Sequence, residues 1–393
     1  MPVRKWRSSV AQRSDIVVIG GGIVGLAVAR RLCLSGCAVT VLDRHRTGRG
    51  ASWAAAGMLA PHCEFDEPDP FFALCKTGLE RYAGFIETLR EETGCPIDYN
   101  STGVVFPALS DRGQARLETR YERHLRDGVP VERLTVREAR RLEPNLTNGI
   151  RMALRYPDDH QVENRDVITA LAQSVLKGGG VIQEGVTARK ILLDGHRVAG
   201  VDTTEGTWKA QTVVNAMGCR ARYLDGIASA WRIPVRPVRG QILALRAGNA
   251  PPFRHTIYTS GVYLVPRSDG RLIIGATVEE AGFRDEVTLG GVMQLFRDAL
   301  ELAPGLKTWA LDSTWSGLRP VARDGWPVLG ATGTPGLFAA SGHGRNGILL
   351  APLTGDLLAE AILHDRVPRI MQPFLPDRFY PAGSGETNDE RDR

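Results

Sequence analysis

Three glycines near the start of the chain have the spacing of a phosphate-binding turn. Gly20, Gly22 and Gly25 follow the pattern G-x-G-x-x-G. In that pattern the first glycine permits a tight turn, the second lets the backbone approach a pyrophosphate, and the third lets a helix pack closely on a strand. Asp43 lies about 20 residues further on, where a carboxylate binds a ribose hydroxyl. Together these residues predict a site for a dinucleotide.

The segments on either side can position these residues. Ile16 to Ile19 is an apolar run typical of a buried parallel strand, Leu26 to Leu34 has helical spacing, and Ala38 to Leu42 predicts a second strand that ends at the acid. The N–H groups at the start of the helix would donate to the phosphates. A glycine triplet alone is often only a strand-to-helix turn, but the complete β-α-β pattern favours the dinucleotide site.

A second glycine-rich loop lies near the C-terminus. Gly342 to Gly347 stands between a predicted strand, Leu337 to Ser341, and a predicted helix, Ile348 to Leu363. Such a helix start carries about half a positive charge and would stabilise an anionic reduced flavin, a site that a simple nicotinamide dehydrogenase does not need. An ordinary strand-to-helix connection is the alternative. The small-residue stretch Gly48 to Met58 fits either backbone lying against a flat ligand or a flexible loop.

Between these two glycine-rich segments the hydrophobic pattern of the sequence departs from β-α alternation and then returns to it. Helices are predicted at 71–89 and 166–176, helical segments over 111–142, and strands at 103–107, 180–183 and 212–218. Strands at 261–266 and 271–275 are joined by a turn containing Asp-Gly, which predicts a hairpin and an antiparallel sheet in a second lobe. We expect a nucleotide domain at 14–80, 160–230 and 315–365, a substrate domain at 81–159 and 231–314, and flexible tails at 1–13 and 381–393.

Composition limits the classes of protein. A chain of 393 residues with 43% hydrophobic content is typical of a soluble globular protein with two domains or one large domain with an inserted lobe. No apolar run approaches the roughly 20 residues that span a membrane, and the basic N-terminus lacks the apolar core of a secretory signal. We therefore expect a cytoplasmic protein with no membrane span.

Charge and cysteine usage point away from nucleic acid and metal partners. The net charge is +5, but the basic residues are dispersed, which favours an anionic cofactor and substrate over nucleic acid. The six cysteines form no C-x-x-C pair and no metal-ligand spacing. We expect reduced, mostly buried thiols and no metal ion.

Four segments resemble the glycine oxidase and D-amino-acid oxidase family of flavoproteins, and the glycine oxidases in it most. They are 20–25, 54–58, the Gly-Leu-Arg-Pro of 317–320 with Asp324, Gly325 and Gly330, and 342–352. The resemblance covers nearly the whole chain. It implies an α/β fold, in which a discontinuous Rossmann-like FAD-binding domain carries an α+β substrate domain built on an antiparallel sheet.

The resemblance also implies site residues. Arg319 and Arg345 would hold the substrate carboxylate, which a guanidinium binds through two parallel hydrogen bonds, and the Tyr263 hydroxyl would assist. Taken alone, either arginine would more often be a surface or ion-pair residue. Positions implied to contact FAD are Gly20, Gly22, Ile23, Val24, Gly25, Asp43, Arg44, Ala51, Ser52, Ala56, Gly57, Met58, Val186, Ala188, Gly218, Gly317, Leu318, His343, Gly344, Asn346, Gly347, Ile348 and Leu349.

The reaction implied is oxidative deamination. A hydride would pass from the Cα of glycine, or of another small amine or D-amino acid, to FAD, and oxygen would then take the electrons to give hydrogen peroxide, glyoxylate and ammonia. The imine could supply thiazole synthesis for thiamine, and a homo-oligomer is expected. FAD is expected to be non-covalent, because no cysteine follows Cys219 and Ala54 stands where some relatives place an attaching histidine.

Several alternatives stay open from the sequence. A D-amino-acid dehydrogenase that reduces a quinone, or a sarcosine or N-methyl amino acid oxidase, would have the same motifs. A tRNA-modifying flavoprotein and an inactive binding module are weaker alternatives. Gly261 and Val278 stand where some glycine oxidases have bulkier residues, which predicts a roomier substrate pocket. Asp43 replaces the glutamate of many relatives.

Overall fold

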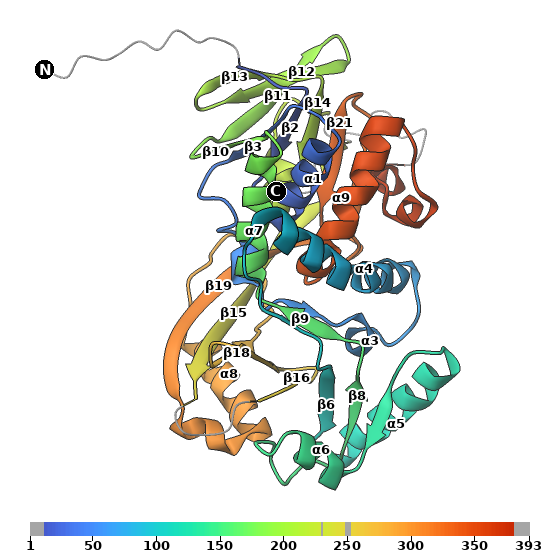
Figure 1. Cartoon of the computed structure of the whole chain (residues 1–393), viewed down its shortest axis with the longest axis vertical. Coiled ribbons are helices and arrows are strands. Elements are labelled where there is room, and N and C mark those ends of the chain that lie inside the picture. Colours follow the sequence, from blue (N-terminus) through green and yellow to red (C-terminus); the bar gives the residue numbers. More distant parts are fainter. Residues whose placement is uncertain (1–11, 229–230, 248–252, 381–393) are drawn as a thin grey trace, which may run out of the picture.

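The molecule has two halves, and each is built around a large β-sheet. The computed structural model describes residues 12–228, 231–247 and 253–380. In Figure 1 the upper half contains a mainly parallel sheet covered by helices, and the lower half contains a long mixed sheet. The tail after Pro381 and residues 1–11, both expected to be flexible, lie outside the described residues. Gln12–Arg13, which the sequence placed in the first tail, form strand β1 because they pair with β13 (Gly206–Lys209).

The upper sheet joins segments that are far apart in the sequence. Its six strands run in the order β10-β3-β2-β14-β21-β20, and all neighbours are parallel except the last pair. This confirms the discontinuous Rossmann-like fold, with the predicted strands near residues 16, 39, 181, 212 and 337 side by side. The strands are β2 (Ile16–Ile19), β3 (Val39–Asp43), β10 (Val181–Glu184), β14 (Thr212–Asn215), β20 (Val328–Ala331) and β21 (Leu337–Ser341).

Helices cover one face of this sheet. Helix α1 packs against α9 and α7, and α4 packs against the same two helices. Their apolar faces form one core with β2 and β3. By length and composition alone α9 could cross a membrane, but 67% of it is buried inside the protein, which fits a core helix. The helices are α1 (Ile23–Leu34), α4 (Pro70–Thr93), α7 (Asn164–Lys177) and α9 (Gly347–His364).

An antiparallel unit on the other face was not predicted. Strands β11 (Ala188–Asp194), β12 (Arg197–Thr203) and β13 pair with β1 in a small sheet. Val201 and Trp208 pack there against the far side of the parallel sheet. The sequence analysis assigned no strand to this segment, because alternation over such short strands is weak.

The lower sheet has eight strands in the order β19-β15-β18-β17-β16-β6-β8-β7. The predicted hairpin is confirmed as β17 and β18, and only β16 and β6 are parallel neighbours. The helical segments expected over 111–142 are found as α5 (Asp111–Arg126) and α6 (Val136–Leu142), and between them lies the strand β7, which was not expected and pairs with β8. The strands are β6 (Val104–Ala108), β7 (Glu132–Leu134), β8 (Met152–Tyr156), β15 (Val235–Arg246), β16 (Thr256–Tyr258), β17 (Tyr263–Pro266), β18 (Arg271–Gly275) and β19 (Ala310–Ala322).

Three helices pack on this lower sheet or at its edge, and short elements connect the halves. The helices are α5 (Asp111–Arg126), α6 (Val136–Leu142) and α8 (Leu289–Leu302). The short elements are α2 (Ala51–Ala54), α3 (Pro61–Glu64), β4 (Met58–Leu59), β5 (Tyr99–Asn100) and β9 (His160–Val162). Single 3-10 turns occur at Gly218–Tyr223, Pro304–Thr308, Arg369–Phe374 and Pro376–Phe379.

Two of the expected domain limits, at residues 80 and 315, fall inside α4 and β19. Helix α4 continues past residue 80, and its residues Ile86 and Leu89 belong to the core under the parallel sheet. Strand β19 begins before residue 315 and pairs with β15 along its length. We propose that the first segment of the FAD-binding domain extends to the end of α4.

Candidate active site

A cavity of about 720 Å³ is lined by both sheets. Residues from the carboxyl ends of β2 and β3 and from the first turns of α1 and α9 form one part of its wall. Residues of β17, β18 and β19 form another. The carboxyl end of a parallel sheet is where such folds bind ligands. The predicted dinucleotide turn and the predicted substrate arginines therefore share one cavity.

Two glycines in the first turn are required by close backbone approach. Gly20 has φ +109°, and a Cβ there would lie 2.3 Å from the Ala216 carbonyl oxygen. A Cβ on Gly25 would lie 1.9 Å from the Gly20 carbonyl oxygen. A side chain at Gly20 would push the turn away from the end of β14, and one at Gly25 would push α1 away from the turn. The turn is thus held in the shape that brings backbone N–H groups to the cavity.

Asp43 is fixed beside this turn. Its Oδ2 accepts the Gly21 N–H at 2.7 Å, and its Oδ1 accepts the His45 N–H at 2.8 Å. Burial raises the pKa of the carboxyl group, while both N–H donors oppose that rise. The carboxylate lines the cavity with lone pairs left to accept further hydrogen bonds.

Two long helices begin at the cavity without a side-chain cap from their N-cap residue. These residues are Gly22 for α1 and Asn346 for α9. In α1 the Ser52 hydroxyl accepts the Ile23 N–H at 2.9 Å, which places that hydroxyl beside the turn. Free N–H groups at a helix start bind anions. Two such helix starts fit FAD, whose pyrophosphate lies between its adenosine and its ribityl-flavin part and whose flavin ring becomes anionic on reduction.

Nearly all predicted cofactor positions line the cavity. The exceptions are Gly25 and Leu349. Gly25 lies under the turn, and Leu349 is fully buried with its carbonyl oxygen against Gly78 of α4. We therefore propose no direct cofactor contact for these two residues.

The predicted substrate residues converge at the other part of the cavity. Arg319 Nη1 donates to the carbonyl oxygen of Thr277 at 3.1 Å, and the Tyr263 side chain is a partner of the same guanidinium. Arg345 Nη1 lies 3.4 Å from the Tyr258 hydroxyl. Burial lowers the pKa of Arg319, but a guanidinium stays charged at any ordinary pH. The two cations leave the cavity strongly attractive to a carboxylate.

Sequence reasoning missed two residues of this wall, Glu64 and Tyr258. Tyr258 lies at the end of β16, and Glu64 is the last residue of α3. Neither belongs to a recognisable motif. The only signal for Glu64 was its position six residues after Met58, in the segment expected to follow the flavin.

The two positions expected to widen the pocket both line the cavity. Gly261 and Val278 are exposed, and a Cβ on Gly261 would meet nothing within 4 Å. The structure therefore leaves open space at this part of the wall. Among the residues that the structure describes, no cluster of His, Cys, Asp or Glu could hold a metal ion.

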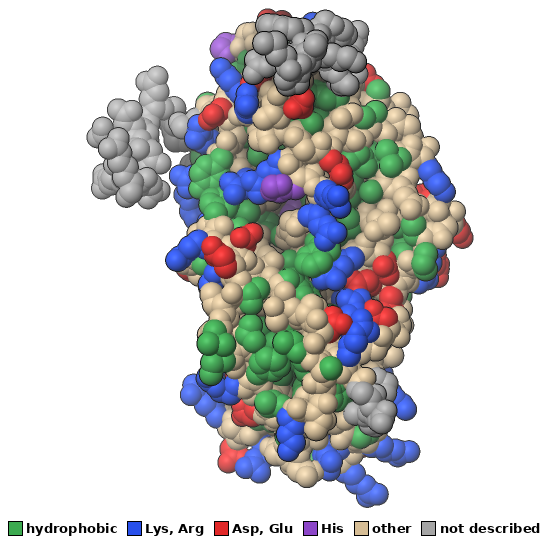
Figure 2. All heavy atoms as spheres, turned by 90° about the vertical axis from the view of Figure 1, so that its left-hand side faces the viewer, with side chains coloured by type: hydrophobic (Ala, Val, Ile, Leu, Met, Phe, Trp, Pro, Cys, Tyr) green, Lys and Arg blue, Asp and Glu red, His purple; other side chains and the backbone are tan. Residues whose placement is uncertain are grey.

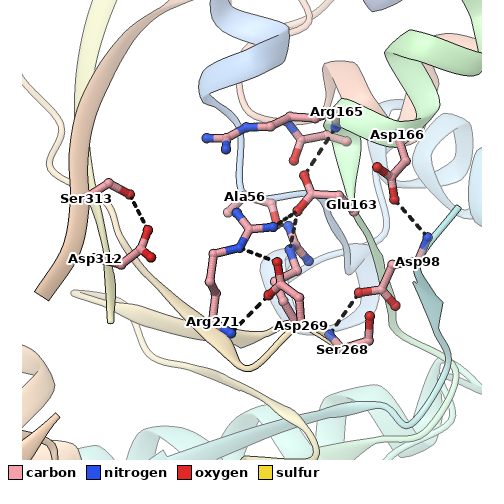
Figure 3. A network of polar contacts seen from close by, with 12 residues as sticks. Ala56, Asp98, Glu163, Arg165, Asp166, Ser268, Asp269, Arg271, Asp312 and Ser313 are labelled. Atoms are coloured by element: carbon pink, nitrogen blue, oxygen red, sulfur yellow. Dashed lines mark hydrogen bonds and ion pairs between the residues drawn. The ribbon is translucent and has the colours of Figure 1, made fainter. Parts of the chain in front are cut away.

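A buried polar network holds the flavin-facing segment (Figure 3). Arg267 Nη2 donates to the Ala56 carbonyl oxygen at 2.6 Å, and Arg267 Nε lies 3.2 Å from Glu163. Arg271 reaches the same carboxylate at 2.8 Å and also pairs with Asp269. The hairpin that carries Tyr263 is thereby tied to the backbone at Ala56.

We expect Arg267→Met to destabilise the protein and loosen FAD. Breaking a buried ion pair costs about 3 to 5 kcal/mol, and Arg271 still neutralises Glu163, so a loss near about 3 kcal/mol of unfolding free energy is expected. Urea unfolding and an FAD dissociation constant measure the two effects. The matched control is Arg246→Met, because Arg246 pairs with Asp312 at the surface, and such pairs contribute about 1 kcal/mol or less. Equal losses in both variants would contradict this role.

The sequence was compared with known families and proteins. The family described as FAD dependent oxidoreductase (DAO) matches residues 15–361. The chain is 35% identical over 370 residues to glycine oxidase of Geobacillus kaustophilus, with 93% of this chain and 97% of that protein covered. It is 38% identical over 372 residues to the bifunctional protein ThiO/ThiG of Synechocystis, with 93% of this chain covered. The chain spans only 54% of that longer relative.

The fold was compared with solved structures. The crystal structure of glycine oxidase from Geobacillus kaustophilus superposes with a TM-score of 0.89 at 35% sequence identity. The match covers 94% of this chain and 99% of that one. The fold of that glycine oxidase is therefore shared over most of this chain.

Proposed function

Because the chain belongs to the family of FAD-dependent oxidoreductases, we propose that it is an amino acid oxidase acting on glycine and other small amino acids. The observation that carries this proposal is the meeting of Arg319, Arg345 and Tyr263 in the cavity that begins at the dinucleotide turn. A cofactor site alone would serve many reactions. Two guanidinium groups and a phenol beside it select a small carboxylate.

FAD is the cofactor, and this chain's backbone and side chains explain how it is held. Once bound, FAD accepts two electrons from the substrate and passes them to oxygen. We propose that the first turn of α1 and the Ser52 hydroxyl hold the pyrophosphate, and that Asp43 accepts hydrogen bonds from the ribose. The start of α9, at Gly347, would stabilise negative charge on the ring.

The substrate residues would act mainly by positioning. Arg319 is held by the Thr277 carbonyl and by Tyr263, so that little freedom is lost when it binds a carboxylate. Two parallel hydrogen bonds from its guanidinium would fix the carboxylate plane and hence the direction of the Cα–H bond. Arg345 adds charge from the loop before α9, where the Gly344 N–H donates to the carbonyl oxygen of Pro320, next to Arg319.

Glycine is the first substrate to test, because several similar proteins with nearly full coverage are glycine oxidases. The open wall at Gly261 and Val278 also favours sarcosine and small D-amino acids. Purified protein in air should convert glycine to glyoxylate, ammonia and hydrogen peroxide in equal amounts. Formation of glyoxylate without peroxide would contradict the oxidase and would favour another electron acceptor.

We expect acid precipitation to leave all FAD in the supernatant. The described residues near the ring offer no attaching group at position 54, where Ala54 packs against Gly317, and no cysteine follows Cys219. The absorbance of the supernatant and of the redissolved pellet measures the two fractions. Yellow colour that stays with the pellet would show a covalent bond and contradict this expectation.

We also propose a role in supplying the imine for thiazole synthesis, which the similarity to the ThiO/ThiG proteins supports.

A cytoplasmic location is a separate proposal. All six cysteines are free, as expected in a reducing compartment. Three are buried, so the expectation of mostly buried thiols holds for half of them.

A homo-oligomer is a further proposal. Apolar side chains gather in the lower half of the face shown in Figure 2, and Leu289, Met293 and Leu311 are among the exposed large hydrophobic residues. On the same face basic side chains lie among acidic ones. Light scattering on the purified protein measures the oligomeric state.

A further inference from the structure

Helix α3 holds Glu64 rigidly at the cavity wall. Asp159, which is fully buried, accepts the N–H groups of His62 and Cys63 at 3.1 and 2.8 Å. It also lies 2.8 Å from His62 Nδ1. These contacts fix the single turn that ends at Glu64, so the direction of the Glu64 side chain is set by its neighbours.

Glu64 has a buried oxygen without a partner. Its Oε2 is inaccessible to solvent and makes no hydrogen bond among the described residues, although the residue lines the cavity. A buried carboxylate oxygen left unpaired costs more free energy than a hydrogen bond returns. The residue as a whole is only half-buried and lines the cavity, so its carboxylate reaches the cavity although Oε2 itself is covered. A donor that arrives with the substrate would offset the cost of the unpaired oxygen.

The charges around Glu64 come from several elements. Arg345, Arg319 and Arg120 attract its carboxylate, and Asp159 repels it. The phenols of Tyr258 and Tyr263 and the thiols of Cys63 and Cys75 also face it. Burial raises the pKa of the carboxyl group to about 7, against the pull of Arg345. The group therefore exchanges a proton near neutral pH.

The cavity thus matches both ends of an amino acid. Two guanidinium groups suit the carboxylate, and the Glu64 carboxylate, which lines the same cavity, suits the ammonium group. A free amino acid is an ammonium at neutral pH, whereas oxidation at Cα needs the lone pair of a neutral amine. A nearby acceptor for one proton would supply that form.

We propose that the Glu64 carboxylate is the catalytic base that binds the substrate ammonium group and takes one proton from it. This inference rests on the proposed function. In the step one N–H bond of the ammonium group breaks, one O–H bond forms on Glu64, and the electron pair stays on nitrogen. The neutral amine is then held beside Arg319, and Glu64 releases its proton to solvent after the product leaves.

The test compares pH profiles of kcat/KM for glycine between the parent protein and Glu64→Gln. The parent profile falls below about pH 7, where Glu64 is protonated, and is flat above it. In the variant only the amine that is already neutral in solution reacts, so kcat/KM rises about tenfold per pH unit. We expect a loss of about 100-fold at pH 7.5 that recovers almost fully by about pH 10.

Two controls separate this role from a structural one. Glu67→Gln changes an exposed glutamate three residues away, which pairs with Arg123 at the surface, and should keep the parent profile. Acetate, which has a carboxylate and no amino group, should perturb the flavin absorbance of Glu64→Gln at a concentration no higher than in the parent. Both readouts are taken at equal FAD content.

The outcomes decide the inference separately from the function. A Glu64→Gln profile that runs parallel to the parent at every pH contradicts the proton-acceptor role. If that variant loses FAD, Glu64→Asp takes its place. Because it keeps a carboxylate, its pH profile should have the same shape as that of the parent. A value of kcat/KM that rises tenfold per pH unit in Glu64→Asp would contradict the role. A parent that oxidises neither glycine, sarcosine nor a small D-amino acid contradicts the proposed function itself.

Discussion

We expect Arg319→Ala to raise the KM for glycine by about 30- to 900-fold while FAD content stays unchanged. One charge-assisted guanidinium–carboxylate contact contributes about 2 to 4 kcal/mol. The guanidinium contacts the Thr277 carbonyl and Tyr263, not the dinucleotide turn. Its loss should therefore leave the affinity for FAD unchanged. Steady-state kinetics and the ratio of flavin to protein absorbance measure the two quantities.

The matched control is Arg323→Ala. Arg323 is exposed, lies four residues further along the same segment and stacks on Phe379. Its removal lowers the net charge equally and should leave KM unchanged. An unchanged KM in Arg319→Ala would remove that residue from the substrate site.

The second large effect is expected from Gly25→Ala, which should abolish FAD binding. The added Cβ would lie 1.9 Å from the Gly20 carbonyl oxygen. This overlap with a backbone atom can be relieved only if α1 moves away from the turn. The first turn would then no longer present its N–H groups to the pyrophosphate. The protein should purify colourless, with lower thermal stability than the apo parent.

Gly84→Ala provides the comparison. Gly84 lies on an exposed position of α4, and a Cβ there would meet nothing within 4 Å. Since alanine is the better helix former, this variant should keep FAD and be slightly more stable. A yellow, fully loaded Gly25→Ala protein would show that the turn is less constrained than its geometry indicates.

The parts of the fold that follow local chemistry were predictable. The strand at 16–19, the glycine turn and Asp43 are found where the sequence placed them, since the turn and the acid belong to one local β-α-β unit and Gly25 is required by a contact with Gly20 inside it. The hairpin of β17 and β18 was found from its turn residues for the same reason.

Features that depend on distant partners were missed. Strand β15 pairs with β19 some 75 residues further on, and no local pattern marks either strand strongly. The role of Glu64 depends on Asp159, which lies 96 residues from Cys63. Nothing in the segment around Glu64 reveals that the turn is anchored there or that arginines from β19 and from the loop before α9 face it.

The site residues were reached by resemblance rather than by local signals. Arg319 and Arg345 are two among many arginines, and composition could not select them. Their meeting in one cavity with Tyr263 is a property of the folded chain. Glu64 and Tyr258 complete that group, and only the structure adds them.

The most direct test of the central claim is to mix the yellow protein with glycine in the absence of oxygen and then admit air. We predict that the flavin absorbance bleaches on mixing and recovers rapidly in air, with one peroxide formed for each glyoxylate. Bleaching without rapid recovery would contradict the oxidase, and absence of bleaching with glycine, sarcosine and small D-amino acids would contradict the amino acid substrate.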